Sequence, residues 1–459
     1  CLIFPMSQKL IKNTSVEKEA ILGGKRAWLI WSLAAIAFGY AFFHRVAPGV
    51  MVHDLMRDFA ISGTMVGTLS ALYFYPYFLL QIPLGALLDV LGARYLLSSA
   101  LFLSALGSLL FGFAYNIEMA YFGRFLIGIG CSVGFLAALT LASKWFPLNR
   151  FALISGLTML IAMTGAILGQ APLALFVSNY GWRSSMWFLS IFGIILGLLV
   201  LIIVRNRPKN ITPEKIHDPW KQMLRCLLIA SKSTQMWRIA LVAATMSAPM
   251  LTLGGLWGTP YLMSAYDLGR SEAAFLTSFM LIGWAFAAPS FGWLSDFLGR
   301  RKPILVAGSA TLTICLGLIV LIPSTNIYVT LTLFTLIGAS GSVMVSAFAL
   351  VKEVIPTNAQ GSAIGIVNSM TVASGAILQP FVGSILDFRW DGRLYDGARI
   401  FNETDYRLAF STIFFSALLG LLVSTSLKEQ LIRPRSPINF SDILISKIYF
   451  FDLDRSFWL

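Results

Sequence analysis

One pattern occurs at two places in this 459-residue chain, as Gly85-Ala-Leu-Leu-Asp89-Val-Leu-Gly92-Ala-Arg94 and as Gly292-Trp-Leu-Ser-Asp296-Phe-Leu-Gly299-Arg300-Arg301-Lys302. Both copies read G-x-L-x-D-x-x-G and end in basic residues, and 207 positions separate them. Each copy lies between two long apolar runs, at the same place in its half of the chain. The pattern therefore indicates a duplicated unit, and we expect two halves of similar architecture.

The composition requires a membrane environment. Apolar residues make up 57% of the chain and charged residues only 12%, with a mean hydropathy of +0.77. Soluble domains carry about a quarter charged residues, so a soluble chain of this composition would lack a polar surface. A helix needs roughly 20 apolar residues to cross a bilayer. The sequence contains twelve such runs, at 27–52, 64–88, 95–114, 119–143, 151–177, 184–204, 239–264, 273–295, 303–323, 327–351, 363–386 and 408–427.

The basic residues predict the orientation of these twelve helices. If the amino terminus is cytoplasmic, 25 of the 34 Lys and Arg residues lie in cytoplasmic segments, 7 lie in outer ones, and Arg45 and Arg124 fall within spans. Because positive residues concentrate on the cytoplasmic side, we expect both termini there. The expected fold is an all-α membrane protein of two six-helix repeats, divided into a cytoplasmic tail (1–26), a first bundle (27–204), a cytoplasmic linker (205–238), a second bundle (239–427) and a cytoplasmic tail (428–459).

This layout resembles the major facilitator superfamily. The resemblance rests on the two repeated loops, on the run Arg124-Phe-Leu-Ile-Gly128-Ile-Gly130 and on the six-plus-six arrangement, and it covers the chain from residue 27 to 427. It implies a carrier that alternates access to a site near the bilayer midplane between its two halves. It also implies that loop residues latch the cytoplasmic side, a role that falls to Asp89, Arg94, Asp296, Arg300 and Arg301.

Charged groups inside the spans indicate the kind of solute. Every Asp and Glu falls outside the twelve runs or within a few residues of their ends, whereas His44, Arg45 and Arg124 lie inside. Ionisable residues at bilayer depth usually face a cavity. Without an acid to neutralise them, the two arginines predict a positive cavity for an anionic group, because a guanidinium can donate to a carboxylate or phosphate at two points. The alternative for each arginine is a structural contact or snorkelling to the outer surface.

A stripe of polar side chains accompanies the arginines. Tyr73, Tyr77 and Gln81 follow one another at every fourth position of the run 64–88, so they share one helix face, which we expect to line the cavity. In the second half we expect Trp257 and Asn368 to contact the solute, and the other polar residues there stay open: Tyr261, Ser342, Ser346 and Gln379. Helix–helix packing is the alternative for each of these residues, since polar residues also gather where membrane helices meet.

Within the superfamily, the sequence is similar to the anion:cation symporters. The similarity lies in Phe42-Phe43-His44-Arg45, with Ala47-Pro48-Gly49 after it, and in Gln81-Ile-Pro-Leu-Gly85. It implies that Arg45 holds the carboxylate of an organic anion. Those carriers have acids at the positions of His44 and Cys131. Either His44 carries a coupling proton in their place, or the protein is a uniporter or an exchanger.

The alternative functions require other groups. An exchanger of phosphate esters would need a base near Thr252, and the run 239–264 contains none, although Arg124 could take its place. A drug exporter for amphipathic cations would need a buried acid. Amino acids or dipeptides stay open because each offers a carboxylate to Arg45, and a non-transporting receptor on the carrier fold stays open as well.

The sequence gives no indication of catalysis. It lacks the clustered His, Asp or Cys that an enzyme or a metal site needs, and it has no nucleotide or flavin motif, so we expect no enzyme, no cofactor and no metal. The expected partners are an anionic solute, the lipid bilayer and, if His44 titrates, a coupling proton, with no nucleic acid. We expect a monomeric multi-pass protein of the cytoplasmic (inner) membrane of a bacterium.

Overall fold

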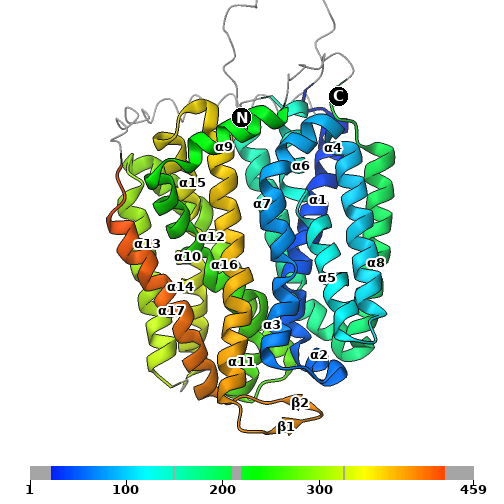
Figure 1. The fold of residues 1–459 in the computed structure, drawn as a ribbon, viewed down its shortest axis with the longest axis vertical. Helices are drawn as coiled ribbons and strands as arrows, with labels where there is room; N and C mark the ends of the chain where they lie inside the picture. Colours follow the sequence, from blue (N-terminus) through cyan, green and yellow to red (C-terminus); the bar gives the residue numbers. More distant parts are fainter. Residues whose placement is uncertain (1–21, 148–149, 209–218, 324–325, 430–459) are drawn as a thin grey trace, which may run out of the picture.

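The chain folds into a bundle of long helices, which Figure 1 shows from the side. This computed structural model describes residues 22–147, 150–208, 219–323 and 326–429. The end at which α1 (Lys25–Val46) begins, and across which α9 (Pro219–Ser231) lies, is called the amino-terminal end here. The opposite end carries α2 (Val52–Phe59) and a β-hairpin and is called the hairpin end. Most of both expected tails, residues 1–21 and 430–459, lies outside the described residues.

A first bundle forms around one apolar core, to which α1, α4, α6 and α8 contribute most of the buried side chains. Side-chain caps start several of its helices. Ser62 and Asn116 each accept a hydrogen bond from the backbone N–H three residues later, which satisfies a donor that the first turn leaves free. Besides α1 and α2, the first bundle contains η1 (Ala47–Val50), α3 (Gly63–Ala71), α4 (Phe74–Gly112), α5 (Ile117–Cys131), α6 (Gly134–Trp145), α7 (Phe151–Leu168) and α8 (Ala171–Ile203).

A second apolar core joins the helices from α10 onward. Its last helix starts with a capping box, in which Asn402 and Asp405 each bind the other's backbone N–H. The second bundle contains α10 (Thr234–Thr252), the π-helical turn η3 (Leu253–Trp257), α11 (Gly258–Tyr266), α12 (Arg270–Leu298), α13 (Lys302–Leu321), α14 (Ile327–Ser342), α15 (Val345–Val354), η4 (Thr357–Ala359), α16 (Gln360–Arg389), β1 (Leu394–Tyr395), β2 (Ala398–Arg399) and α17 (Glu403–Thr425).

Eleven stretches of the described chain are long and apolar enough to cross a membrane. The sequence predicts twelve. The missing span is one of the two predicted at 151–177 and 184–204, because the structure contains one apolar stretch of 51 residues there, Leu153–Ile203. That is more than twice the length that a crossing needs. Gly181, within the expected joint 178–183, interrupts it with a left-handed backbone (φ 80°) that a helix cannot contain.

Several local predictions differ from the structure. The run 64–88 is broken at Leu72 and Tyr73, where α3 ends and α4 begins. The linker 205–238 is not purely a connection, because it contains α9, and α10 begins at Thr234, before the expected boundary at 239. Ser233 caps α10 by accepting from Met236, which extends the helix into the polar segment. The all-α expectation also missed the antiparallel pair β1–β2.

The two bundles are joined closely at the hairpin end. Asp387, at the end of α16, accepts hydrogen bonds from the backbone N–H groups of Gly63 and Thr64, at 2.8 and 2.7 Å. Arg270, at the start of α12, pairs with Asp54 of α2 at 2.7 Å. These contacts place polar links between the bundles at the end opposite α9 (Figure 1).

Candidate functional site

The two predicted arginines lie in one region of the first bundle. Arg124, on α5, approaches α1 and donates a hydrogen bond to the carbonyl oxygen of His44 at 2.8 Å. Its helix comes close to α4 because Gly128 has no side chain: a Cβ there would lie 2.4 Å from the carbonyl oxygen of Tyr73. Gly128 thus allows the guanidinium of Arg124 to reach the point where α4 begins.

Aromatic rings cover both guanidinium groups. The Cζ atom of Arg124 lies 4.8 Å from the ring centre of Tyr73, and that of Arg45 lies 5.2 Å from the ring centre of Tyr77. The two tyrosines stack on each other with their centres 5.9 Å apart, so one pair of stacked rings contacts both cations. Arg45 also lies 4.1 Å from the ring centre of Phe42. Such cation–π contacts partly offset the cost of removing a guanidinium from water.

Neither arginine has an acidic partner within the described ranges. Arg124 is 1% exposed and Arg45 is 8% exposed. The Nε atoms of both residues and Nη2 of Arg124 are buried without a hydrogen-bond partner. A buried donor without a partner costs about 1–3 kcal/mol, and more when it is charged. The arrangement therefore has unused donor capacity that an anionic ligand can satisfy.

Gln81 and Asn368 link the bundles beside this region. The side-chain nitrogen of Asn368, on α16, donates to the side-chain oxygen of Gln81 at 2.9 Å, and Gln81 donates to the carbonyl of Ser132 at 3.3 Å. One residue further along α16, Ser369 donates to the carbonyl of Phe78. The structure thus brings Gln81 and Asn368 together, from opposite halves of the sequence.

A second polar group surrounds the π-helical turn η3. Trp257 donates to the carbonyl of Gln379 at 3.0 Å, and the amide nitrogen of Gln379 donates to Leu251 at 2.7 Å. From the first bundle, Gln170 donates to the carbonyl of Gly254 at 2.7 Å. The side-chain oxygens of both glutamines are buried without a partner. π-Helical turns are frequent at functional sites.

Our selection of site residues from the sequence missed Gln170 and left Gln379 open. Both are almost completely buried, at 1% and 0% exposure. The available signal was a single amide inside an apolar run, which looks the same whether it packs between helices or faces a solute. The predicted Trp257 is fully buried and lies beside Gln379.

His44 points in another direction from Arg45. Its Nε2 atom lies 3.3 Å from the hydroxyl of Ser108 on α4, and its ring meets the ring of Tyr40 edge to face at 4.5 Å. Tyr40 in turn donates to the carbonyl of Leu189 on α8. The imidazole is therefore held inside the first bundle, while its backbone carbonyl accepts from Arg124.

The predicted cytoplasmic gate residues lie at the amino-terminal end. Arg301 pairs with Glu353 at 3.2 Å, donates to Ser295 at 2.7 Å and binds Glu429 through its backbone N–H. Arg300 is exposed and lies 3.8 Å from Glu429. These contacts link helices of the second bundle with one another and with Glu429, just after α17.

In the first bundle, Arg94 donates to the carbonyl of Leu201 at 2.7 Å, near the end of α8. Its backbone N–H donates to the side chain of Asn206 at 2.8 Å. The side chains of Asp89 and Asp296 lie outside the described part of the structure. The contacts of Arg94 therefore tie helices within one bundle.

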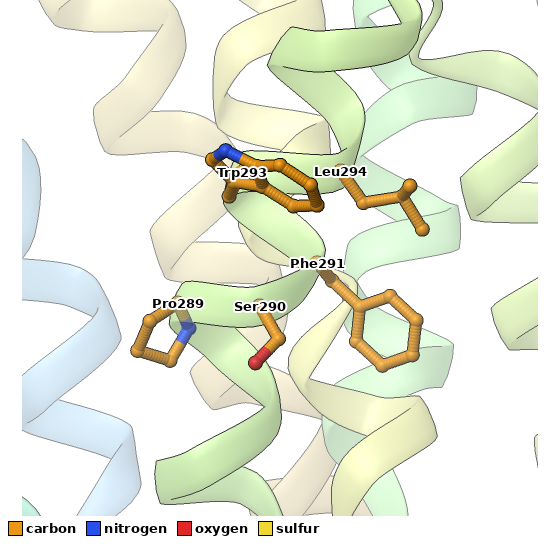
Figure 2. A pocket seen from close by; sticks show the side chains of 5 residues that line it. All are labelled: Pro289, Ser290, Phe291, Trp293 and Leu294. Carbon is orange, nitrogen blue, oxygen red and sulfur yellow. The ribbon is translucent and has the colours of Figure 1, made fainter. Parts of the chain in front are cut away.

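A concavity of about 550 Å³ follows α12 on the side of the amino-terminal end. Figure 2 shows the five side chains that line it: Pro289, Ser290, Phe291, Trp293 and Leu294. All five belong to one helix and none is charged. This concavity does not contain the candidate anion site.

The sequence model of the Major Facilitator Superfamily matches residues 31–380 and 250–432. The chain belongs to this superfamily. The family resemblance drawn from the two repeated loops is confirmed. Members of the superfamily are transporters and not enzymes, and the protein is a multi-pass membrane protein with apolar helices.

Individual relatives agree with this membership. The sialic acid transporter NanX of Escherichia coli is 23% identical over 409 residues, which cover 86% of this chain and 92% of that protein. A proposed tartrate transporter of Agrobacterium vitis is 24% identical over 339 residues, 70% of this chain and 75% of that protein. Among solved structures, a bacterial homolog of the human lysosomal transporter Spinster, in an inward-facing conformation, shares the fold with a TM-score of 0.70 at 16% identity, over 88% of this chain and 97% of that one.

Proposed function

We propose that this protein carries a small organic anion across the membrane by alternating access, with Arg45 and Arg124 as the groups that hold the anionic part. One observation carries the proposal: two buried guanidiniums lie against the stacked rings of Tyr73 and Tyr77, retain donors without a hydrogen-bond partner and have no acidic partner among the described residues. The solute supplies the negative charge that the site lacks. The relatives named for sialic acid and tartrate support this choice, since both compounds are carboxylates.

The rest of the solute meets polar groups from both bundles. Gln170 and Gln379 hold their amide nitrogens on backbone carbonyls and leave their oxygens free to accept. An acceptor of this kind binds a hydroxyl group. We therefore favour a carboxylate that carries hydroxyl groups. Tyr73, Tyr77, Gln81, Trp257 and Asn368 complete the proposed site.

The proposed topology has twelve spans, because the break at Gly181 divides Leu153–Ile203 into two. In this proposal the amino-terminal end and both termini lie in the cytoplasm, which the distribution of basic residues supports. The bundles 27–204 and 239–427 rock about the site, with 205–238 as linker and the tails 1–26 and 428–459 outside them. Asp89, Arg94, Asp296, Arg300 and Arg301 act as the cytoplasmic gate.

The protein works as a monomer in a bacterial inner membrane. It is either a facilitator or a carrier coupled to protons through His44.

Amino acids and dipeptides are the second class of solute. Their ammonium group would need an aromatic face or a carbonyl, and guanidinium groups already cover Tyr73 and Tyr77. The hydroxy acid glycolate and the amino acid glycine differ mainly in this one group. A preference for glycine over glycolate would favour the second class.

The test is a ligand screen on the purified protein. A bound ligand stabilises only the folded protein, so organic acids, hydroxy acids, amino acids and cationic amines are compared by the rise in unfolding temperature. We expect hydroxy acids to stabilise the wild type and to leave Arg45→Ala unchanged. Uptake of the best ligand into proteoliposomes then separates a carrier from a receptor. Stabilisation by cationic amines alone would contradict the proposal.

A further inference from the structure

The amphipathic helix α9 has one face that the protein covers. It lies across the amino-terminal end of the bundle, where it contacts α4 of the first bundle and α10 and α16 of the second (Figure 1). Cys226 and Ala230 are buried in this contact, at 5% and 0% exposure. Successive residues of a helix are rotated by about 100°, so the buried positions define one sector of α9 and leave the others open.

The open surface of α9 is divided into an apolar and a basic sector. Trp220, Leu224 and Leu228 stand at every fourth position and are 43%, 54% and 61% exposed. They form a continuous apolar stripe next to the buried sector. Lys221 and Arg225 are also exposed and lie on the far side of that stripe, roughly 60–100° further around the helix. Around the helix, the sector that contacts the protein is therefore followed by the apolar stripe and then by the basic sector.

We propose that α9 docks on the leaflet at the amino-terminal end, with Trp220, Leu224 and Leu228 among the acyl chains and Lys221 and Arg225 on the phosphates of anionic phospholipid. The order of the sectors fits this position. A helix that lies along the rim of a membrane bundle has protein on one side, hydrocarbon on the next and headgroups beyond it. Tryptophan and long basic side chains favour this boundary because each combines an apolar body with a polar end.

Charge complementarity selects anionic lipid over other partners. Between residues 205 and 238 the sequence has eight Lys or Arg residues and two acids, Glu214 and Asp218, and no Asp or Glu lies between 219 and 238. A basic segment beside an anionic leaflet gains attraction from each Lys or Arg near the surface. The inference does not depend on the identity of the solute, because the main contacts of α9 are with α4, α10, α16 and η4, whereas Arg45 and Arg124 lie on α1 and α5.

Photo-crosslinking in vesicles tests the proposal. Benzoylphenylalanine replaces Leu228 in the full chain, which is reconstituted in equal amounts of phosphatidylglycerol and phosphatidylcholine, and lipid adducts are identified by mass spectrometry. We expect adducts at position 228, with phosphatidylglycerol favoured by about threefold or more. The variant that also carries Lys221→Gln and Arg225→Gln should keep the adducts and lose the preference.

Two control positions make the experiment decisive. Ile314, in the middle of α13 and 63% exposed, should give adducts without a preference for either lipid, and Tyr395, 68% exposed on the hairpin, should give none. Adducts at 314 but not at 228 would overturn the proposal, since α9 would then face water or another protein. An equal ratio of the two lipids at 228 in the otherwise unchanged chain would overturn it too.

Discussion

Arg124 on α5 donates a hydrogen bond to the backbone carbonyl of His44 on α1, over 2.8 Å, and this contact fixes the residue next to Arg45. One of the two proposed anion-binding groups thus positions the backbone of the other. Arg124 keeps Nε and Nη2 free while it does so. The guanidinium therefore has both a structural contact and donors to spare, so it can bind a solute without first breaking the link between α1 and α5.

Replacing Arg45 by lysine should weaken anion binding although the charge is kept. A lysine presents a point charge and cannot donate in a two-point geometry to a carboxylate. We expect the dissociation constant for the best ligand of the screen to rise roughly tenfold to a hundredfold, as for the loss of a charged hydrogen bond. Isothermal titration calorimetry measures it. The control is Arg393→Lys, an exposed arginine of the hairpin segment; equal affinity in Arg45→Lys and the wild type would remove Arg45 from the site.

Gln170→Leu should reduce the discrimination between hydroxylated and plain acids. The free oxygen of Gln170 accepts a solute hydroxyl in our proposal, and a net hydrogen bond is worth about 0.5–1.5 kcal/mol. The ratio of affinities for tartrate and succinate should therefore fall about threefold to tenfold. Gln235→Leu, which changes a glutamine at the amino-terminal end, should leave the ratio unchanged. A ratio that stays the same in Gln170→Leu would show that its oxygen does not face the solute.

The sequence predicted the membrane class and the family because these depend on many residues at once. Apolar runs and the repeated loop are patterns of many residues, so they do not depend on any single tertiary contact. The buried arginines were also predictable, since charge inside an apolar run is rare and costly.

The orientation of individual side chains could not be predicted. His44 and Arg45 are neighbours, yet one side chain packs against Ser108 and the other against Tyr77. Which face of α1 meets α4 depends on packing across distant parts of the chain. The same holds for Gln170, whose amide donates a hydrogen bond to the carbonyl of Gly254, 84 residues away in the sequence. An apolar run contains no signal for such a contact.

His44→Gln tests proton coupling. Glutamine can keep a hydrogen bond to Ser108 but cannot carry a proton, so coupling through His44 predicts that solute uptake no longer responds to a pH gradient. Uptake into proteoliposomes with and without the gradient measures this. His53→Gln, at the hairpin end, is the matched control and should respond as the wild type does. An unchanged gradient response in His44→Gln would assign the imidazole to packing.

Asp58 should make stability depend on pH. Burial raises the pKa of this carboxyl, but hydrogen bonds from Trp182, Arg183 and Arg57 outweigh it, so the pKa in the folded protein lies below its ordinary value. Its stabilising contribution is then complete above the ordinary value and is lost as the pH falls toward the folded one. Asp58→Asn should lower the unfolding temperature by roughly 1–3 °C at pH 7 and by less near pH 3. A constant difference from pH 7 to pH 3 would contradict this account.

Asp387 should hold the hairpin end closed. It accepts from the backbone and hydroxyl of Thr64, at 2.7 and 2.6 Å, and from Arg399 at 3.0 Å, so it caps a helix of the opposite bundle. Opening this end exposes the first turn of α3 and leaves its donors to water. Losing such a cap costs about 0.5–2 kcal/mol. Asp387→Asn should therefore raise the ratio of open to closed molecules roughly threefold to tenfold.

The distance between the bundles at the hairpin end reports this ratio. Spin labels at Tyr180 of α8 and Tyr328 of α14, both strongly exposed, allow it to be measured by double electron–electron resonance. Asp267→Asn is the control, because it removes the same charge near this end from an exposed residue whose left-handed backbone (φ 52°) asparagine tolerates. If both variants shift the distances equally, net charge rather than the cap on α3 sets the equilibrium. If only Asp387→Asn increases the longer distance, the cap closes the hairpin end.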